Sequence, residues 1–256
     1  MSTAVFSPTA GTRDARPGLA RLTLVELRKM TDTRSGFWLL LATAALTVAI
    51  VAIACLVFPA EDSNLFNFFI MAVQPASILM PIVGILLVSS EWTQRTAMVT
   101  FTLVPQRSRV LVAKLLAGLT LSAIAFQICL IAALAATAFF GADGDGTWSL
   151  SAGLIVQVAV SVVVPMLIGI GFGAVLLASA PAIVLYFVLP TAFAALGAIS
   201  ALSGAARWLD QTRTMEPLLE ETLSATQWAR VATSLALWLA VPIALGFWRV
   251  LRSDVR

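Results

Sequence analysis

The distribution of charge along the chain constrains its fold more than any other feature. All 16 Lys and Arg and all 13 Asp and Glu fall outside six apolar windows. These windows are residues 37–58, 68–89, 115–140, 152–178, 181–202 and 231–248. Each approaches or exceeds the roughly 20 apolar residues that an α-helix needs to cross a bilayer. Because backbone in lipid must satisfy its own hydrogen bonds, the sequence predicts an all-α integral membrane protein with six transmembrane helices.

The residue types that build most metal sites and catalytic centres are scarce. The chain has no His, and its two cysteines, Cys55 and Cys129, lie in different apolar windows. The windows also contain no acid that could act at membrane depth. We therefore predict no catalytic residues, no metal site and no cofactor bound by this chain. An intramembrane enzyme is disfavoured for the same reason.

Basic residues gather on one side of the predicted spans. Thirteen of the 16 Lys and Arg precede the first span, lie between the second and third spans, or follow the sixth. The connections on the opposite side contain three Arg and eight acidic residues. The positive-inside rule then predicts a multi-pass protein of the plasma membrane with both termini in the cytoplasm. Topology and anionic membrane lipid account for the pI of about 9.4, so no nucleic-acid partner is predicted.

The segment before the first span divides into two parts. Residues 1–16 are rich in Ser, Thr, Ala, Gly and Arg without periodicity, which predicts a disordered tail. From residue 17 to the end we expect a single transmembrane domain. It begins with an amphipathic helix, since apolar residues from Leu19 to Met30 share one face and charged residues occupy the others. Such a helix lies along the membrane surface, and Ser35–Gly36 would let the chain turn into the bilayer. A simple membrane anchor explains this pattern equally well.

Several predicted spans contain residues that interrupt a regular helix. The second span has Gln74, Pro75 and Pro81, and the fifth has Pro190. Proline frees backbone carbonyls that lipid cannot solvate but a protein-lined cavity can. These four residues are therefore candidates for the lining of a transport pathway. Packing against neighbouring helices would satisfy the same carbonyls, and this alternative stays open.

The fourth span contains the string GIGFG, in which Gly169 and Gly173 form a GxxxG pair. The string lies inside an apolar span with no following Lys, so it does not fit a phosphate-binding loop. A GxxxG pair lets two helix backbones approach closely. We therefore predict a helix-packing face here.

The connection between the fifth and sixth spans, residues 203–230, is longer than the other two on that side. Its apolar residues recur at roughly helical spacing, and Pro217 interrupts the pattern. We expect two short interfacial helices that cap the outer leaflet.

The sequence contains no source of energy for transport. A proton-coupled or ion-coupled carrier usually has an ionisable group at membrane depth, and the six windows have none. The only lysines, Lys29 and Lys114, fit no GxxxxGK[ST] phosphate-binding pattern. If this protein is a pump, another chain must supply the energy.

The connection between the second and third spans has the most specific pattern. Residues 89–118 read SSEWTQRTAMVTFTLVPQRSRVLVAKLLAG. In order, the stretch offers an acid, a basic residue, Thr, a Pro followed by two Arg, and a Lys that enters the third span. These residues are Glu91, Arg95, Thr96, Pro105, Arg107, Arg109 and Lys114. This order resembles the pattern of ABC-2-type permeases, which are membrane subunits of ATP-binding-cassette transporters.

A second segment is similar to the same family. VELRKM, Val25 to Met30, resembles the amphipathic connecting helix that precedes the first span of such permeases, and its charged residues are Glu26, Arg28 and Lys29. The resemblance implies that residues 90–109 include a short coupling helix that docks a cytoplasmic ATPase. Glu91 and Arg95, at positions i and i+4, are expected to pair along it.

The resemblance also implies partners and a function. The expected partners are a separate ATP-binding-cassette ATPase, which holds ATP and Mg, a second permease copy or paralogue, and membrane lipid. The expected function is export of an amphipathic, drug-like or lipid-like substrate by a subunit that is not itself an enzyme. The alternative is a non-transporting membrane scaffold or immunity subunit.

Overall fold

The computed structural model describes residues 18–94, 96, 102, 106–144, 146–220 and 222–252, and every regular element in these ranges is helical. Six stretches are long and apolar enough to cross a membrane. They are α2 (Arg34–Val57), α3 (Leu65–Thr93), α5 (Arg107–Phe140), α6 (Ala152–Leu176), α7 (Ser179–Leu196) and the stretch Ala225–Arg252. The prediction of six apolar spans is confirmed, and the fold indicates a multi-pass membrane protein.

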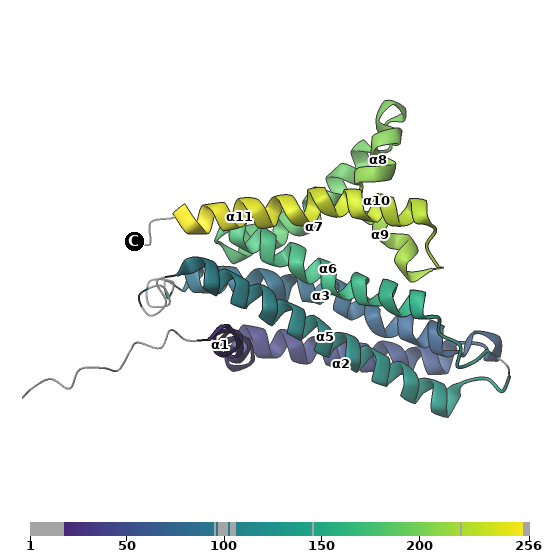
Figure 1. The fold of residues 1–256 in the computed structure, drawn as a ribbon. Coiled ribbons are helices and arrows are strands. Elements are labelled where there is room, and N and C mark those ends of the chain that lie inside the picture. The colour runs from purple at the N-terminus through teal and green to yellow at the C-terminus, as the bar shows by residue number, and fades with distance from the viewer. Residues whose placement is uncertain are drawn as a thin grey trace, which may run out of the picture.

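Helices α3 and α6 form the centre of the bundle (Figure 1). Helices α2 and α5 pack on one side of this pair, and α7 and α11 (Val241–Arg252) pack on the other. The fully buried large side chains, such as Phe68, Phe69 and Met166, belong mainly to the central pair. By contrast, α7 exposes most of its apolar side chains, as expected for a helix at the bundle edge that faces lipid.

The close-packing face predicted in the fourth span is confirmed. A Cβ atom added at Gly169 would lie 2.2 Å from the carbonyl oxygen of Pro81, and one added at Gly173 would lie 2.8 Å from that of Ile85. The backbones of α6 and α3 are therefore in direct contact, because neither glycine has a side chain to separate them.

Some helices extend beyond the charge-free windows. The third span, α5, begins at Arg107 instead of residue 115, and α3 continues to Thr93. A charged residue is unfavourable in lipid but is compatible with a helical backbone. A charge in the sequence therefore marks the membrane boundary and not the end of the helix. As a result, Glu91 and Lys114 both lie on the end turns of long helices.

The last span is divided in two. Its first half, α10 (Ala225–Leu235), joins α11 through a π-helical turn, η4 (Ala236–Ala240). Trp238 in this turn is buried, and its Nε1–H donates a hydrogen bond to the carbonyl oxygen of Leu209 at 2.7 Å. The hydrogen bond ties the division point to the connection between α7 and α10.

The connection between α7 and α10 is helical in short pieces. It contains η2 (Ser200–Leu202), α8 (Ser203–Leu209), α9 (Gln211–Met215) and η3 (Glu216–Leu219). Pro217 is the second residue of the 3₁₀ turn that follows α9, so the predicted interruption is confirmed. A shorter 3₁₀ turn, η1 (Ala60–Asp62), lies in the connection between α2 and α3.

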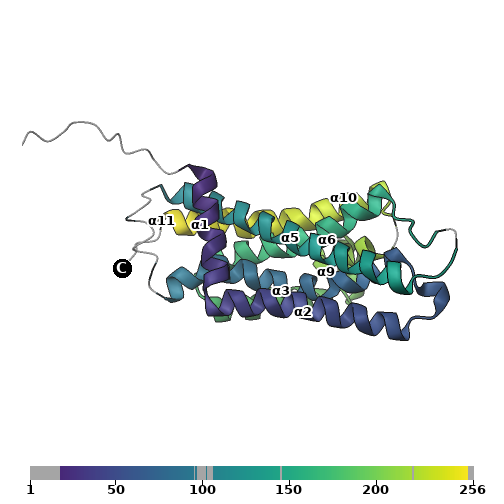
Figure 2. The ribbon, with the colours of Figure 1, turned by 90° about the horizontal axis from the view of Figure 1, so that it is seen from below.

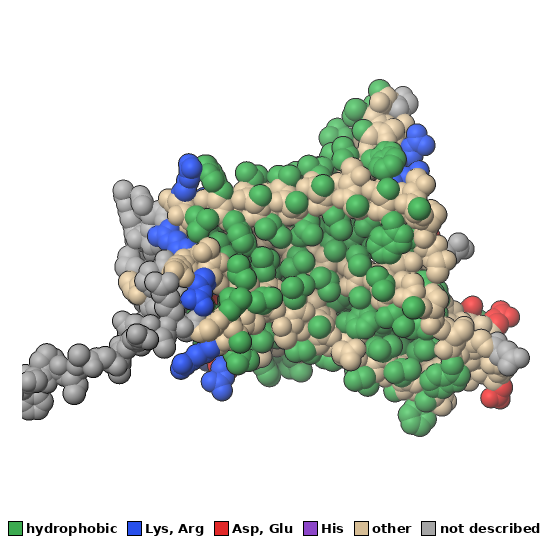
Figure 3. Space-filling view, viewed as in Figure 1, with side chains coloured by type: hydrophobic (Ala, Val, Ile, Leu, Met, Phe, Trp, Pro, Cys, Tyr) green, Lys and Arg blue, Asp and Glu red, His purple; other side chains and the backbone are tan. Residues whose placement is uncertain are grey.

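Helix α1 (Leu19–Asp32) does not run along the bundle axis. It lies across the spans at the end where α11 finishes (Figure 2). Gly36 permits the sharp turn from α1 into α2, since a Cβ atom there would lie 2.1 Å from the carbonyl oxygen of Met30. Most Lys and Arg side chains visible in Figure 3 gather at this end, and Asp and Glu side chains gather at the other.

Candidate functional site

The crosswise helix α1 presents a charged side chain to the bundle as well as apolar ones. Its two buried residues are Glu26 and Met30, and Arg21 and Arg28 on the same helix are exposed. The helix packs mainly against α5 and α2, and it contacts α3 through the ion pair between Lys29 and Glu91. Glu26 is only 4% exposed, so its carboxylate requires partners within the protein.

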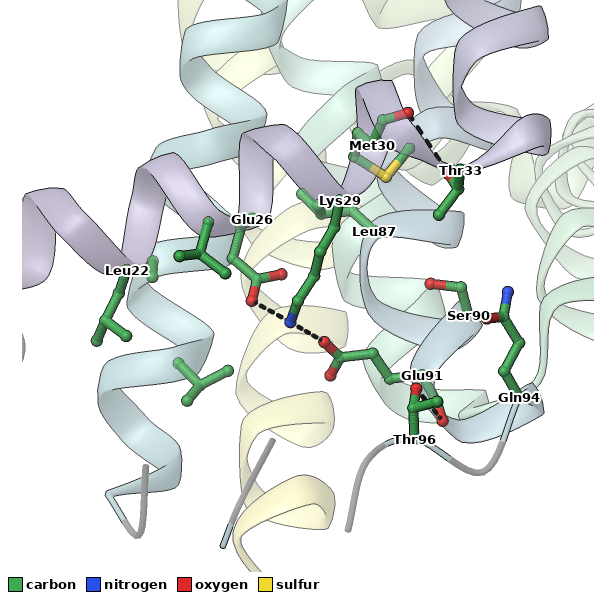
Figure 4. Close-up of a pocket in the computed structure, with 13 residues that line it drawn as sticks. Leu22, Glu26, Lys29, Met30, Thr33, Leu87, Ser90, Glu91, Gln94 and Thr96 are labelled. Atoms are coloured by element: carbon green, nitrogen blue, oxygen red, sulfur yellow. Dashed lines mark hydrogen bonds and ion pairs between the residues drawn. The ribbon is translucent and has the colours of Figure 1, made fainter. Parts of the chain in front are cut away.

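Those partners are Lys29 and Lys114, and together with Glu26 and Glu91 they form a network of four charges from three helices. Lys29 Nζ lies 2.9 Å from Glu26 Oε1 and 2.6 Å from Glu91 Oε1, and Figure 4 shows it between the two carboxylates. Lys114 Nζ lies 2.6 Å from Glu26 Oε2 and 3.2 Å from Glu91 Oε1. We call Glu26, Lys29, Glu91 and Lys114 the charge quartet. It joins α1, the last turn of α3 and the first turns of α5.

The charge quartet is electrically balanced, with two carboxylates and two ammonium groups. It also uses both lysines of the chain, whose other 14 basic residues are all Arg. Burial lowers the pKa of Lys29, but the carboxylates of Glu26 and Glu91 outweigh that effect and raise the pKa above its ordinary value. Lys29 is therefore protonated within the quartet. A buried network of this kind strongly penalises the loss of any one member, because the remaining charge is left without compensation.

Basic residues at this end also hold the backbone ends of neighbouring helices. Lys114 Nζ donates a hydrogen bond to the carbonyl oxygen of Leu87 at 2.8 Å. Arg107 donates to the carbonyl oxygen of Val250 in α11, and Arg249 donates to that of Val175 in α6. The last carbonyls of a helix have no partner within the helix and carry partial negative charge. Val250 and Val175 lie among the last four residues of α11 and α6, so the two arginine contacts stabilise two helix ends that lie close together.

The quartet changes the interpretation of the residues assigned to ATPase coupling. Glu91 is 6% exposed and Lys114 is 3% exposed, so neither side chain is available for direct contact with another protein. Both instead position α1. Of the remaining coupling candidates, Thr96 is exposed, Arg107 and Arg109 are half-buried, and Arg95 and Pro105 lie outside the described residues. The predicted pairing of Glu91 with Arg95 is therefore not described, whereas Glu91 pairs with the two lysines.

The proposed connecting helix has its three charged residues in different environments. Glu26 is buried, Lys29 is half-buried within the quartet, and Arg28 is exposed. Arg28 is thus the one of the three whose side chain points away from the bundle. Sequence reasoning found these residues but not their partners, which lie 62 and 88 positions further along the chain. The available signal was that two acids and the only two lysines lie near helix ends at the same side of the membrane.

The candidates for pathway lining lie in different environments. Pro75 and Pro81 are buried in α3, whereas Gln74 and Pro190 are half-buried on different helices. The carbonyl oxygen of Pro81 is covered by the backbone of α6 at Gly169. The backbones of α3 and α6 are thus in close contact at Pro81, but the carbonyl that this proline frees belongs to Ser77, so the pathway and packing interpretations both stay open.

A cavity opens beside the charge quartet. It has a volume of about 520 Å³ and lies between α1, the end of α3 and the start of α5. Glu26, Lys29 and Glu91 contribute to its wall, and Lys114 does not. Apolar side chains, such as Leu22, Met30 and Leu87, form most of the remaining surface (Figure 4). Within the described ranges, no three acidic or Cys side chains converge as they would around a metal ion.

Comparison with known proteins adds no family assignment: no protein-family model matches the chain, and no curated protein matches it.

Proposed function

We propose that this chain is the permease subunit of an ATP-binding-cassette transporter of the ABC-2 type. It would export an amphipathic, drug-like or lipid-like substrate, using ATP that a separate cytoplasmic ATPase hydrolyses. It would act in the plasma membrane, with both termini in the cytoplasm, together with a second permease copy or paralogue. The chain itself would have no catalytic role.

One observation carries this proposal. The two segments that resemble ABC-2 permeases, 25–30 and 91–114, are far apart in sequence but share the charge quartet. Glu91 opens the second segment, Lys114 closes it, and their charged atoms lie 3.2 Å apart. Both residues also bind Lys29 or Glu26 of the first segment. A solvated loop that merely obeys the positive-inside rule requires no such connection.

The arrangement supports a mechanical role for this end of the bundle. Residues 94–106 connect two spans whose ends are both fixed to α1 through ion pairs. A force applied to this connection would therefore move α1, α3 and α5 together. Buried charge pairs suit such a linkage, because their free energy depends strongly on geometry and resists separation.

The test is a search for the ATPase followed by a coupling measurement. The tagged protein is purified from its host membrane, and an ATP-binding-cassette ATPase is expected to co-purify. In the reconstituted complex, Arg95→Ala should reduce ATP hydrolysis or ATPase binding while leaving the thermal stability of the permease unchanged. Arg207→Ala, at the opposite end of the bundle, is the matched control and should retain full activity. Purification of the intact protein without any such ATPase, from a host that contains one, would overturn the proposal.

A further inference from the structure

We propose that the cavity beside the charge quartet is a binding site for an amphipathic primary amine, whose ammonium group takes the place of Lys29 between Glu26 and Glu91. The site would accept an apolar body in the cavity and a single –NH₃⁺ group at its charged wall. This inference does not depend on the proposed transport function.

The net charge of the cavity wall favours a ligand with one positive charge. Without the Lys29 side chain, Glu26, Glu91 and Lys114 carry a net charge of −1. One additional cation restores neutrality, and the distances of 2.9 and 2.6 Å show that an ammonium nitrogen fits between the two carboxylates. Lys29 thus occupies a preformed ammonium site.

The two lysines differ in how easily they could leave. The Lys29 side chain is 37% exposed, whereas that of Lys114 is 4% exposed. Lys29 also lines the cavity, and Lys114 does not. A long flexible side chain at the rim of a cavity can leave for water, where its ammonium group is hydrated, provided that the ammonium group of the ligand then compensates the two carboxylates. Lys29 is therefore the displaceable cation, and Lys114 is a fixed part of the site.

The cavity itself fits the rest of such a ligand. Its volume of about 520 Å³ lies within the ~300–1,000 Å³ range of small-molecule sites, which combine an apolar lining with a few polar groups. Leu22, Met30, Leu87, Val110 and Ala113 supply the apolar lining, and Ser90 adds a hydroxyl near the charged wall. An alkylammonium ion fits this site, because its alkyl chain can contact the apolar lining while its ammonium group contacts the charged wall.

The binding test uses octylammonium and nanodiscs of phosphatidylcholine, a lipid whose headgroup has no N–H donor. Binding is measured against empty nanodiscs. Octan-1-ol and octyltrimethylammonium are the controls, since the first lacks charge and the second lacks N–H donors. Octylammonium is expected to bind wild-type protein, whereas the two controls only partition into the lipid. Equal binding of all three compounds would overturn the proposal.

Variants at Lys29 provide the decisive comparison. Lys29→Met removes a tethered competitor whose effective concentration is about millimolar, so it should tighten octylammonium binding by roughly tenfold or more. Lys29→Arg keeps a cation in the site and should show no such gain. Adding Glu26→Gln to Lys29→Met neutralises the wall and should abolish the gain. Unchanged affinity in Lys29→Met would refute the inference.

A measurement on the wild-type chain covers the case in which Lys29→Met fails to fold. With only two lysines, protein labelled with ¹³Cε-lysine should give two side-chain NMR signals. Saturating octylammonium should move the Lys29 signal toward that of a hydrated lysine and leave the Lys114 signal in place. Binding without movement of the Lys29 signal would contradict displacement.

Replacing phosphatidylcholine with phosphatidylethanolamine separates two sources of the amine. Competition with octylammonium would identify a membrane aminolipid, and lack of competition would identify a soluble amine.

Discussion

Lys114→Met tests whether the charge quartet stabilises the end of the bundle that α1 crosses. The substitution keeps a long side chain that fills the same space but removes the ammonium group. Glu26 then loses its partner at 2.6 Å, Glu91 loses one at 3.2 Å, and the Leu87 carbonyl oxygen loses its donor at 2.8 Å. Because these groups are buried, the variant retains a net charge of −1 that water cannot solvate.

The expected cost follows from that uncompensated charge. Removing one partner of a buried ion pair destabilises a protein by about 3–5 kcal/mol. Reversible unfolding in mixed micelles with increasing denaturing detergent should show a loss of this size. Arg28→Met is the matched control on α1, since Arg28 is exposed and a surface substitution changes stability by only about 0.5 kcal/mol.

A double variant separates charge balance from packing. Glu26→Gln together with Lys114→Met removes one negative and one positive charge, and it leaves Lys29 paired with Glu91. We expect the double variant to be more stable than the sum of the single variants predicts, by about 0.5–3 kcal/mol. A strictly additive result, or a Lys114→Met variant as stable as wild type, would refute the view that charge balance holds α1 in place.

Two further predictions concern the bundle and its orientation. Gly169→Ala should destabilise the protein by about 1–3 kcal/mol, because the added Cβ would lie 2.2 Å from the Pro81 carbonyl oxygen. The control is Gly153→Ala on the same helix, where the added Cβ meets only ordinary contacts. It should be neutral or stabilising in the same unfolding assay. In a background without Cys55 and Cys129, Ala60→Cys, Ser149→Cys and Thr222→Cys, all at exposed positions, should react with a membrane-impermeant thiol reagent outside intact cells. Ser108→Cys, also exposed, should react only after the cells are opened, and the reverse labelling pattern would contradict cytoplasmic termini.

Much of the fold could be predicted because lipid imposes a simple rule on sequence. Charge-free windows located all six spans, and the GxxxG pair identified the face on which α6 meets α3. The helix ends were less predictable. Arg107 and Arg109 mark where α5 leaves the lipid, yet the helix includes both, since hydropathy reports the solvent around a residue and not its backbone conformation.

The candidate site was predictable only as a set of residues. The spacing of Glu91 and Arg95 suggested a local pair, because helical periodicity reveals neighbours that are three or four positions apart. The pairing of Glu91 with Lys29 depends on how α1 folds back across the bundle, which no local pattern encodes. Likewise, Pro81 has the sequence signature of a pathway residue, and its close contact with Gly169 depends on how α6 packs against α3.

The placement of the charge quartet in the chain also sets an order of assembly during synthesis. Helix α1 emerges first, when Glu26 and Lys29 can pair only with each other, at i and i+3. Glu91 arrives 62 residues after Lys29, and Lys114 arrives 88 residues after Glu26. Until the third span begins to insert, Glu26 lacks its closest partner, Lys114. Without this ion pair, α1 is expected to stay at the hydrated membrane surface. Helix α1 can therefore dock fully only after the first three spans have inserted with Glu91 and Lys114 at the same depth as Glu26 and Lys29.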